Sequence, residues 1–368
     1  MIKFKVIFNV FLLLGVILAG CSSGSNAVDD KESEPKSVSG DVQQTEGNKE
    51  EAEGKTEVQY YYTANEEGSI SKIDAADNSI VTTIEVEGSA HNVQVSPDGK
   101  LIGATVVPGM EGHGGGHGGH GEVSAKAVFY SVESDELIQK VEVGNHPAHI
   151  VFTEDGKYAV VTNNEDNTAS VIDMDSFNVT DTVETGKGPH GFRISSDSKR
   201  AYIANMGEDT VSVINLETMK EEKRIKVGIA PVTTGVTSDG KTLVASLNGE
   251  NALAVVDLAT DRVEKIPVGT GPAQVYIDEK DQFAYVANQG TEEAPSSSVT
   301  VIDLALKKAI AEIETGKGSH GVVTSPDNKR VYVTNMFENT VSIIDKEQNK
   351  VIDTIEVKGV PNGISITD

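Results

Sequence analysis

Histidine is the residue type in this chain whose number and spacing point to metal chemistry. The 368-residue sequence contains eight of them, at His91, His113, His117, His120, His146, His149, His190 and His320. Neutral imidazole is a ligand for zinc, copper, nickel and iron. Because only the neutral form coordinates, we expect metal affinity to fall below about pH 6.5. The histidines are therefore the first candidates for a metal site.

Three of the histidines lie in a segment of low complexity, residues 109–121, made mostly of glycine and histidine. His113, His117 and His120 are four and three residues apart, but the intervening glycines oppose a stable helix. An adaptable backbone would let three imidazoles surround one ion, at an entropy cost on binding. We predict that this tract binds divalent ions, with Met110 as a further candidate ligand. A flexible spacer without a metal role is the alternative.

Two other methionines, Met206 and Met336, each follow an asparagine at the end of a short apolar segment. A thioether beside imidazoles would favour Cu(I). The plainer interpretation is that both side chains fill gaps in the core. Copper therefore gains only a small preference over zinc and nickel.

The histidines are carried by a repeat of four short apolar segments. Its second segment reads Tyr158-Ala-Val-Val-Thr-Asn163, Tyr202-Ile-Ala-Asn205, Tyr285-Val-Ala-Asn288 and Tyr332-Val-Thr-Asn335. Short alternating segments between polar turns predict antiparallel strands. The segment that sets the period begins at Ala90, Pro147, Pro189, Pro231, Pro272, Ser319 and Pro361, in steps of 57, 42, 42, 41, 47 and 42 residues. This period predicts an all-β fold, a seven-bladed β-propeller with four-stranded blades.

The phase of the repeat predicts how the ring closes. The first unit, from Tyr60, matches a second strand, and the last segment, residues 361–368, matches an innermost strand. We therefore expect the C-terminal strand to pair with the N-terminal blade, which leaves no open sheet edge within the ring.

All eight histidines map to one face of this disc, because successive strands alternate in direction. His91, His190 and His320 each follow the first residue of an innermost strand, in the first, third and sixth of these strands. Their separations of two, three and two blades predict imidazoles that converge at the channel mouth. His146 and His149 flank the start of another innermost strand and are further candidate ligands. Histidines that only fill the mouth are the alternative to a metal ring.

Asparagines and aspartates recur at fixed places in the units, which predicts a structural role in Asx turns. They are Asn65, Asn163, Asn205, Asn288 and Asn335 at the second segment, Asp173, Asp257, Asp303 and Asp345 at the third, and Asp98, Asp155, Asp197, Asp239 and Asp327 in the first turn.

The Tyr-Val-Thr-Asn repeats and the Ser96-Pro-Asp-Gly99 turn resemble the YVTN family of bacterial and archaeal β-propellers, of YncE-like type, over about residues 58 to 368. The resemblance implies the fold but no single activity, since similar propellers include lactonases and others hold haem d1 or a copper cluster. The nitrous oxide reductase propeller is similar in carrying channel histidines. This chain has far fewer and lacks the second copper-binding domain.

The only cysteine, Cys21, ends a segment typical of an export signal. Lys3 and Lys5 precede an apolar run, residues 6–18, that is too short for a comfortable membrane span. Leu18-Ala-Gly-Cys21 resembles the bacterial lipobox, in which the cysteine is lipidated. An ordinary signal peptide with an incidental cysteine is the alternative.

Three regions follow from this interpretation. Residues 1–20 are the expected signal peptide, residues 21–57 a disordered acidic tether, and residues 58–368 the propeller. We expect a bacterial surface lipoprotein, held outside the cytoplasm on the cell membrane by a lipid at Cys21.

Composition excludes several classes of function. The 57 acidic and 31 basic residues give a formal charge of −26, which repels nucleic acid. A single cysteine excludes an internal disulfide, an all-cysteine metal site and, without Cys-x-x-Cys-His, covalent haem c. The sequence has no His-Glu-x-x-His motif.

Three functions remain. The first is a lipoprotein that binds a zinc, copper or nickel ion through its histidine-bearing face. The second is a scaffold for an extracellular protein or a cell-wall polymer, with no metal role. The third is a propeller enzyme, lactonase-like or redox. We favour the first, name no catalytic residue, and expect a monomer.

Overall fold

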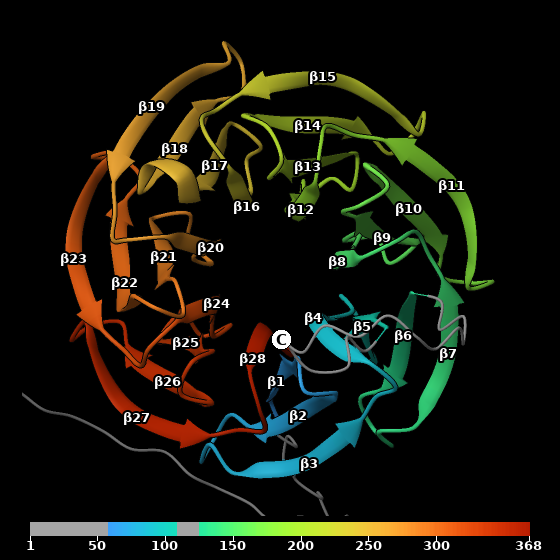
Figure 1. Ribbon diagram of the computed structural model, residues 1–368, viewed down its shortest axis with the longest axis horizontal. Helices are drawn as coiled ribbons and strands as arrows, with labels where there is room; N and C mark the ends of the chain where they lie inside the picture. The colour runs from blue at the N-terminus through green and yellow to red at the C-terminus, as the bar shows by residue number, and fades with distance from the viewer. Residues whose placement is uncertain (1–57, 109–124) are drawn as a thin grey trace, which may run out of the picture. The chain divides into compact units, whose positions relative to one another are not determined.

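Seven antiparallel four-stranded sheets surround a central channel in the computed structural model, which describes residues 58–108 and 125–368 (Figure 1). The compact unit that contains them spans Thr56–Asp368. The structure thus confirms the predicted seven-bladed propeller. The following predictions lie outside the described residues: the signal peptide 1–20, the tether 21–57, lipidation at Cys21, and the ligands Met110, His113, His117 and His120.

Six blades consist of consecutive strands, with the innermost strand first. They are β4 (Ser89–Val95), β5 (Leu101–Val107), β6 (Lys126–Ser131) and β7 (Leu137–Glu142); β8 (Pro147–Phe152), β9 (Tyr158–Asn163), β10 (Thr168–Asp173) and β11 (Asn178–Glu184); β12 (Pro189–Ile194), β13 (Arg200–Asn205), β14 (Thr210–Asn215) and β15 (Lys220–Lys226); β16 (Pro231–Val236), β17 (Thr242–Leu247), β18 (Ala252–Asp257) and β19 (Arg262–Pro267); β20 (Pro272–Ile277), β21 (Phe283–Gly290), β22 (Pro295–Asp303) and β23 (Lys308–Glu314); β24 (Ser319–Thr324), β25 (Arg330–Asn335), β26 (Thr340–Asp345) and β27 (Lys350–Glu356). A single 3-10 turn, η1 (Asn248–Glu250), separates β17 from β18. Among the described residues, no helix is both long and apolar enough to span a membrane.

The seventh blade joins the two ends of the propeller, as the phase of the repeat predicts. Its innermost strand is β28 (Pro361–Ile366), followed by β1 (Tyr60–Asn65), β2 (Ser69–Asp74) and β3 (Ile80–Glu85). Tyr60 N–H donates to Thr367 Oγ1 at 2.9 Å, beyond the end of the strand pair. Closure pairs both edges that a linear array of blades would leave open.

The turn between the two inner strands of a blade is held by an aspartate. Ser96 Oγ donates to Asp98 Oδ1 at 2.7 Å, and Lys100 N–H donates to the same oxygen at 3.1 Å. Gly99, with φ of +68°, takes the left-handed position that this turn needs. The arrangement recurs at Asp155, Asp197, Asp239 and Asp327. The structural role predicted for these aspartates is confirmed.

The asparagines that end the second strand of a blade are structural too, but by another contact than the predicted Asx turn. Asn205 Nδ2 donates to Thr210 Oγ1 at 2.9 Å and to Ser212 Oγ at 3.0 Å. The side chain thus ties the second strand to the third. Asn65, Asn163, Asn288 and Asn335 make equivalent bonds.

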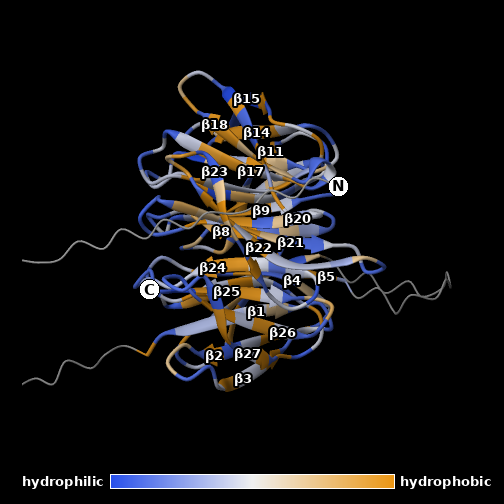
Figure 2. Ribbon diagram, turned by 90° about the vertical axis from the view of Figure 1, so that its left-hand side faces the viewer, coloured by the Kyte–Doolittle hydropathy of each residue, from blue (hydrophilic) through white to orange (hydrophobic). Residues whose placement is uncertain are grey.

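The core lies between neighbouring blades. Phe192, Ile203 and Ile214 of one blade pack with Val151 and Val160 of the blade before it. Burying such a side chain contributes about 1.5–3 kcal/mol to the free energy that stabilises the fold. Figure 2 shows apolar strands in the body of the disc and mostly hydrophilic turns on its faces. Packing between the blades therefore fixes the positions of the innermost strands and of the side chains that these strands direct into the channel.

Candidate metal centre

A β-bulge near the start of each innermost strand decides which side chain reaches the channel mouth. In β8 the pairing shifts between Pro147 and Ile150, so that Ala148 and His149 share one opposite residue of β9. In β12 the same shift follows Pro189 and contains His190. A bulge bends the strand and re-aims its side chains. A histidine at either bulge position can therefore point to the channel axis.

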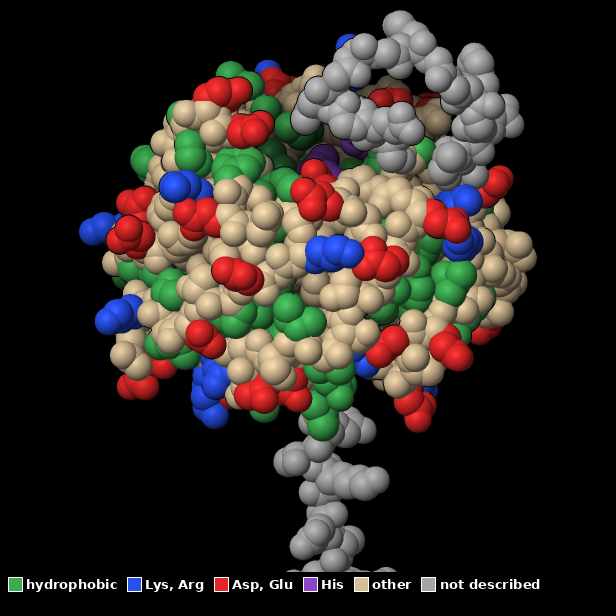
Figure 3. All heavy atoms as spheres, turned by 60° about the horizontal axis from the view of Figure 1, so that its bottom comes forward, with side chains coloured by type: hydrophobic (Ala, Val, Ile, Leu, Met, Phe, Trp, Pro, Cys, Tyr) green, Lys and Arg blue, Asp and Glu red, His purple; other side chains and the backbone are tan. Residues whose placement is uncertain are grey.

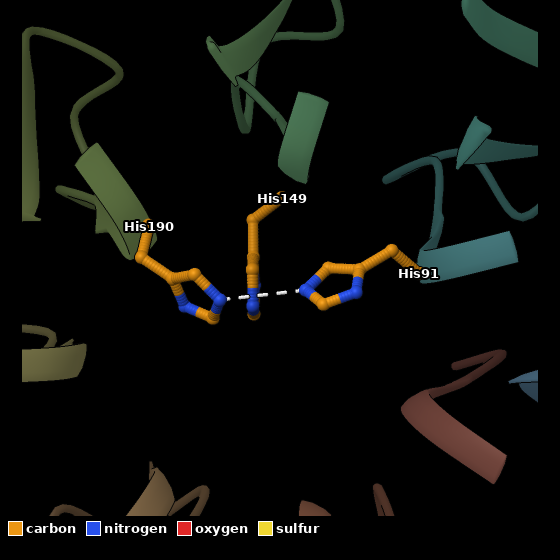
Figure 4. A group of neighbouring side chains, drawn as sticks. All are labelled: His91, His149 and His190. Carbon is orange, nitrogen blue, oxygen red and sulfur yellow. Dashed lines mark hydrogen bonds between the residues drawn. The ribbon is translucent and has the colours of Figure 1, made fainter. Parts of the chain in front are cut away.

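His91 of β4, His149 of β8 and His190 of β12 converge from three consecutive blades (Figure 4). One ring nitrogen from each lies within 4.8 Å of the others, and the Nε2 atoms of His91 and His190 are 3.4 Å apart. Two nitrogens bound tetrahedrally to one ion, each at about 2.0–2.1 Å, would lie about 3.3–3.4 Å apart. The His91–His190 pair thus has the spacing that a shared ion requires.

The outer nitrogens of this pair already have acceptors. His91 Nδ1 lies 3.2 Å from Glu66 Oε1, and His190 Nδ1 lies 3.2 Å from the Val232 carbonyl oxygen. A carbonyl only accepts, so His190 Nδ1 carries the proton and donates it. His91 Nδ1 also lies 3.2 Å from Asn362 Nδ2, and it carries the proton in the tautomer that donates to Glu66. The two Nε2 lone pairs then face each other at 3.4 Å. A cation between them would turn this repulsion into attraction.

His149 is the most deeply buried member of the group. It is 1% exposed, and neither of its ring nitrogens has a hydrogen-bond partner among the described residues. A buried polar atom left unpaired costs about 1–3 kcal/mol. Burial lowers the pKa of His149 well below its ordinary 6.5, and repulsion by His190 and His91 lowers it further. The ring is therefore neutral, with a lone pair that a metal ion would satisfy.

Glu66 supplies the negative charge beside the site. Burial would raise the pKa of this carboxyl, but the hydrogen bond and charge of His91, with a hydrogen bond from Asn362 Nδ2 at 2.6 Å, lower it to about 2. An anionic carboxylate that accepts from the outer nitrogen of a ligating histidine fixes its tautomer and raises its basicity. Burial meanwhile lowers the pKa of His190 to about 3, with repulsion by His91 adding to the shift.

His320 does not belong to this group, although the even spacing of the blades predicts it beside His91 and His190. It lies on β24, is buried, and has its Nδ1 3.5 Å from Gln274 Nε2. The blades of His91, His190 and His320 are spread evenly around the ring and lie on different sides of the channel. The converging rings come instead from the three consecutive blades that begin with β4, β8 and β12. The neighbouring His149 therefore takes the place expected for His320.

The remaining described candidates lie around the group. His146, in the turn before β8, has its ring centroid 6.4 Å from that of His91. Met336 accepts a hydrogen bond from Gln289 Nε2 at its sulfur and is 8% exposed, as a gap-filling side chain would be. Met206 is 42% exposed. Figure 3 shows histidine side chains in a hollow on this face, with acidic side chains on the surface around it.

Sequence reasoning missed Glu66. It follows Asn65 directly, and Met206 and Met336 follow the equivalent asparagines in their own blades. Because successive strands alternate in direction, the connection after this asparagine lies on the same face as the start of the innermost strand, so its first residue is a usable signal for a group beside the site.

Comparison with solved structures finds other propellers. Hydrazine synthase from Kuenenia stuttgartiensis is 20% identical, with a TM-score of 0.64 over 75% of this chain and 89% of that one. A putative 6-phosphogluconolactonase from Bacteroides fragilis is 14% identical, with a TM-score of 0.66 over 85% and 99%. The periplasmic gluconolactonase PpgL of Pseudomonas aeruginosa is 16% identical, with a TM-score of 0.67 over 84% and 99%. At such identities the likeness shows the fold alone.

Sequence comparison gives the family. No curated protein matches the chain. The family described as YNCE-like beta-propeller, however, matches residues 131–368, from the end of β6 to the last residue. This match covers more than half of the sequence and agrees with the resemblance carried by the Tyr-Val-Thr-Asn repeats. The chain belongs to the YNCE-like β-propeller family.

Proposed function

We propose that this propeller binds one transition-metal ion through His91, His149 and His190. The observation that carries the proposal is the pair of Nε2 atoms 3.4 Å apart, each on a ring whose Nδ1 is held by an acceptor. The unpaired nitrogens of buried His149 supply the third ligand. Three imidazoles beside one carboxylate suit Zn(II), Cu(II) and Ni(II).

Three protein ligands leave a zinc-like ion one position for water or an incoming ligand. Such a site exchanges its ion or its bound ligand more readily than a closed site of four protein ligands. We therefore propose that the protein captures a metal ion for sequestration or delivery. The lipobox-like segment ending in Cys21 supports export and tethering to the membrane, so the ion would be met outside the cytoplasm.

Equilibrium titration of the full chain with Zn(II), Cu(II) and Ni(II) tests the proposal. The parent should carry H113A, H117A and H120A, so that the glycine–histidine tract contributes no ligand. We expect one ion per chain, with binding lost in H149A and in H190A. H320A changes a buried histidine outside the group and should retain binding. No binding by the parent, or binding by H149A and H190A as tight as that of the parent, would refute the proposed site.

A further inference from the structure

We infer that His146 is the exchange ligand through which the metal ion enters and leaves the buried site. This inference rests on the proposed function and adds to it a route for the ion.

Exposure increases stepwise from the buried ligand to His146. His149 is 1% exposed, whereas the side chains of His91 and His146 are 15% and 33% exposed. The ring centroids of His146 and His91 are 6.4 Å apart, with the rings nearly perpendicular at 76°. His146 is thus an imidazole that solvent can reach and that borders His91, a half-buried member of the three. An ion arriving from solvent would meet it before meeting His149.

The turn that carries His146 does not require an imidazole. His146 has a φ of +50°, in the left-handed region that favours glycine. The equivalent residues before the other innermost strands include Gly188, Gly271, Gly318, Ala230 and Val360, all with positive φ. The same turn therefore forms with glycine, alanine or valine. Packing of the turn gives no reason for histidine, so its chemistry has to supply one.

The distances favour a transit role over permanent coordination. Two imidazoles bound tetrahedrally to one ion would have ring centroids about 5.1 Å apart. The His91–His190 and His149–His190 pairs, at 5.4 and 5.0 Å, are close to this value. The His91–His149 and His91–His146 pairs are wider, at 6.1 and 6.4 Å, but of these rings His146 alone lies outside the group whose ring nitrogens are all within 4.8 Å of one another. His146 therefore stands just outside the resting coordination shell, within reach of a side-chain rotation.

An acidic neighbour completes the arrangement. Glu165 Oε1 lies 3.5 Å from His146 Nδ1, which leaves Nε2 for an ion and adds negative charge beside it. The backbone is fixed, since Asn164 N–H donates to the His146 carbonyl oxygen at 3.0 Å. Movement of the imidazole is therefore movement of the side chain. During uptake, the Nε2 atom of His146 can bind the ion as a water ligand dissociates. During release, it can bind the ion as a buried imidazole dissociates, so that each metal–ligand bond is replaced by another.

Because uptake and release follow the same path, loss of His146 should slow both and leave their ratio unchanged. H146G is the suitable variant, since Gly188 and Gly271 occupy the same turn position in other blades. A230G makes the matched change in a turn without histidine. Both are made in the full chain carrying H113A, H117A and H120A. Stopped-flow measurement gives the rate of Zn(II) uptake and the rate of its release to a chelator.

We expect H146G to lower both rates by about tenfold, the effect of a barrier raised by about 1.4 kcal/mol. The dissociation constant should stay the same, and A230G should match the parent in both rates. Equal rates in H146G and the parent would overturn the inference. Faster release with weaker affinity would also overturn it, because His146 would then be a permanent ligand. Failure of the proposed function looks different, since the parent itself would take up no zinc.

Discussion

The Nε2 atoms of His91 and His190 lie 3.4 Å apart although 99 positions separate the two residues in the sequence. One blade stands between theirs, and it contributes His149 to the same point (Figure 4). Glu66 and the Val232 carbonyl orient the outer nitrogens of the pair. The channel mouth thus holds three imidazoles whose ring nitrogens lie within 4.8 Å of one another, which is an arrangement suited to a cation.

Replacing His149 by leucine should separate binding from stability. The variant loses a metal ligand but also removes two buried nitrogens that have no partner among the described residues. Since an unpaired buried polar atom costs about 1–3 kcal/mol, we expect metal-free H149L to be as stable as the parent or more so. Thermal unfolding with and without Zn(II) measures both effects. A less stable metal-free H149L, or one that zinc still stabilises, would contradict this prediction.

Glu66→Gln should weaken metal binding without removing a ligand. The amide can no longer offer His91 Nδ1–H a charged acceptor, so the tautomer with a free Nε2 loses its support. Loss of such a partner typically lowers metal affinity by about 10–100-fold. Competition titration with a chelator measures the change. Glu67→Gln, at the neighbouring exposed residue, is the matched control and should leave affinity unchanged; equal affinities in the two variants would count against the role of Glu66.

The metal-free protein should lose stability as the pH falls below 6.5. Burial lowers the pKa of His190 to about 3 and that of His320 to about 4, so the unfolded chain takes up protons that the folded chain excludes. The contribution is complete above the ordinary histidine pKa of 6.5 and is lost as the pH falls toward these values, at up to about 1.4 kcal/mol per histidine and pH unit. Urea unfolding at several pH values tests this. H149L should show a shallower dependence, and a flat profile in the parent would refute the assignment.

Metal affinity should depend on pH less steeply than the sequence alone predicts. Three solvated imidazoles would each bind a proton below about pH 6.5, and affinity would fall with the third power of proton concentration. His149 and His190 stay neutral because burial lowers their pKa values. The logarithm of the dissociation constant should therefore change by at most about one unit per pH unit between about pH 6.5 and 5. A change of about three units in the logarithm of the dissociation constant per pH unit would indicate that exposed histidines bind the ion instead.

Ring closure should depend on the packing of β28. Ile364, on β28, is 5% exposed. It packs with Tyr61 of β1 in its own blade and with Val323 and Tyr332 of the blade formed by β24–β27. Ile364→Ala should lower the free energy of unfolding by about 2–5 kcal/mol. Ile352→Ala, at a residue 49% exposed on β27, should change it by less than about 0.5 kcal/mol. Equal urea midpoints for the two variants would contradict a closed ring.

The sequence was sufficient for the architecture because each blade repeats the same local signals. The match of the first unit, from Tyr60, to a second strand and of the last segment, from Pro361, to an innermost strand was enough to place β28 beside β1. The site was only partly predictable. His91 and His190 follow from their register in the repeat, but the bulge lets His149, one position further on, reach the same point. The place of Glu66 after Asn65 can be found in the repeat, but its contacts with His91 and Asn362 join different blade segments and cannot be seen in a single unit.

Crystals of the full chain soaked with Zn(II) and measured at the zinc edge would show whether His91, His149 and His190 hold one ion. We expect one anomalous peak at the channel mouth, about 2.0–2.1 Å from a nitrogen of each of His91, His149 and His190. Zinc peaks elsewhere on the protein, with none between these three rings, would contradict it.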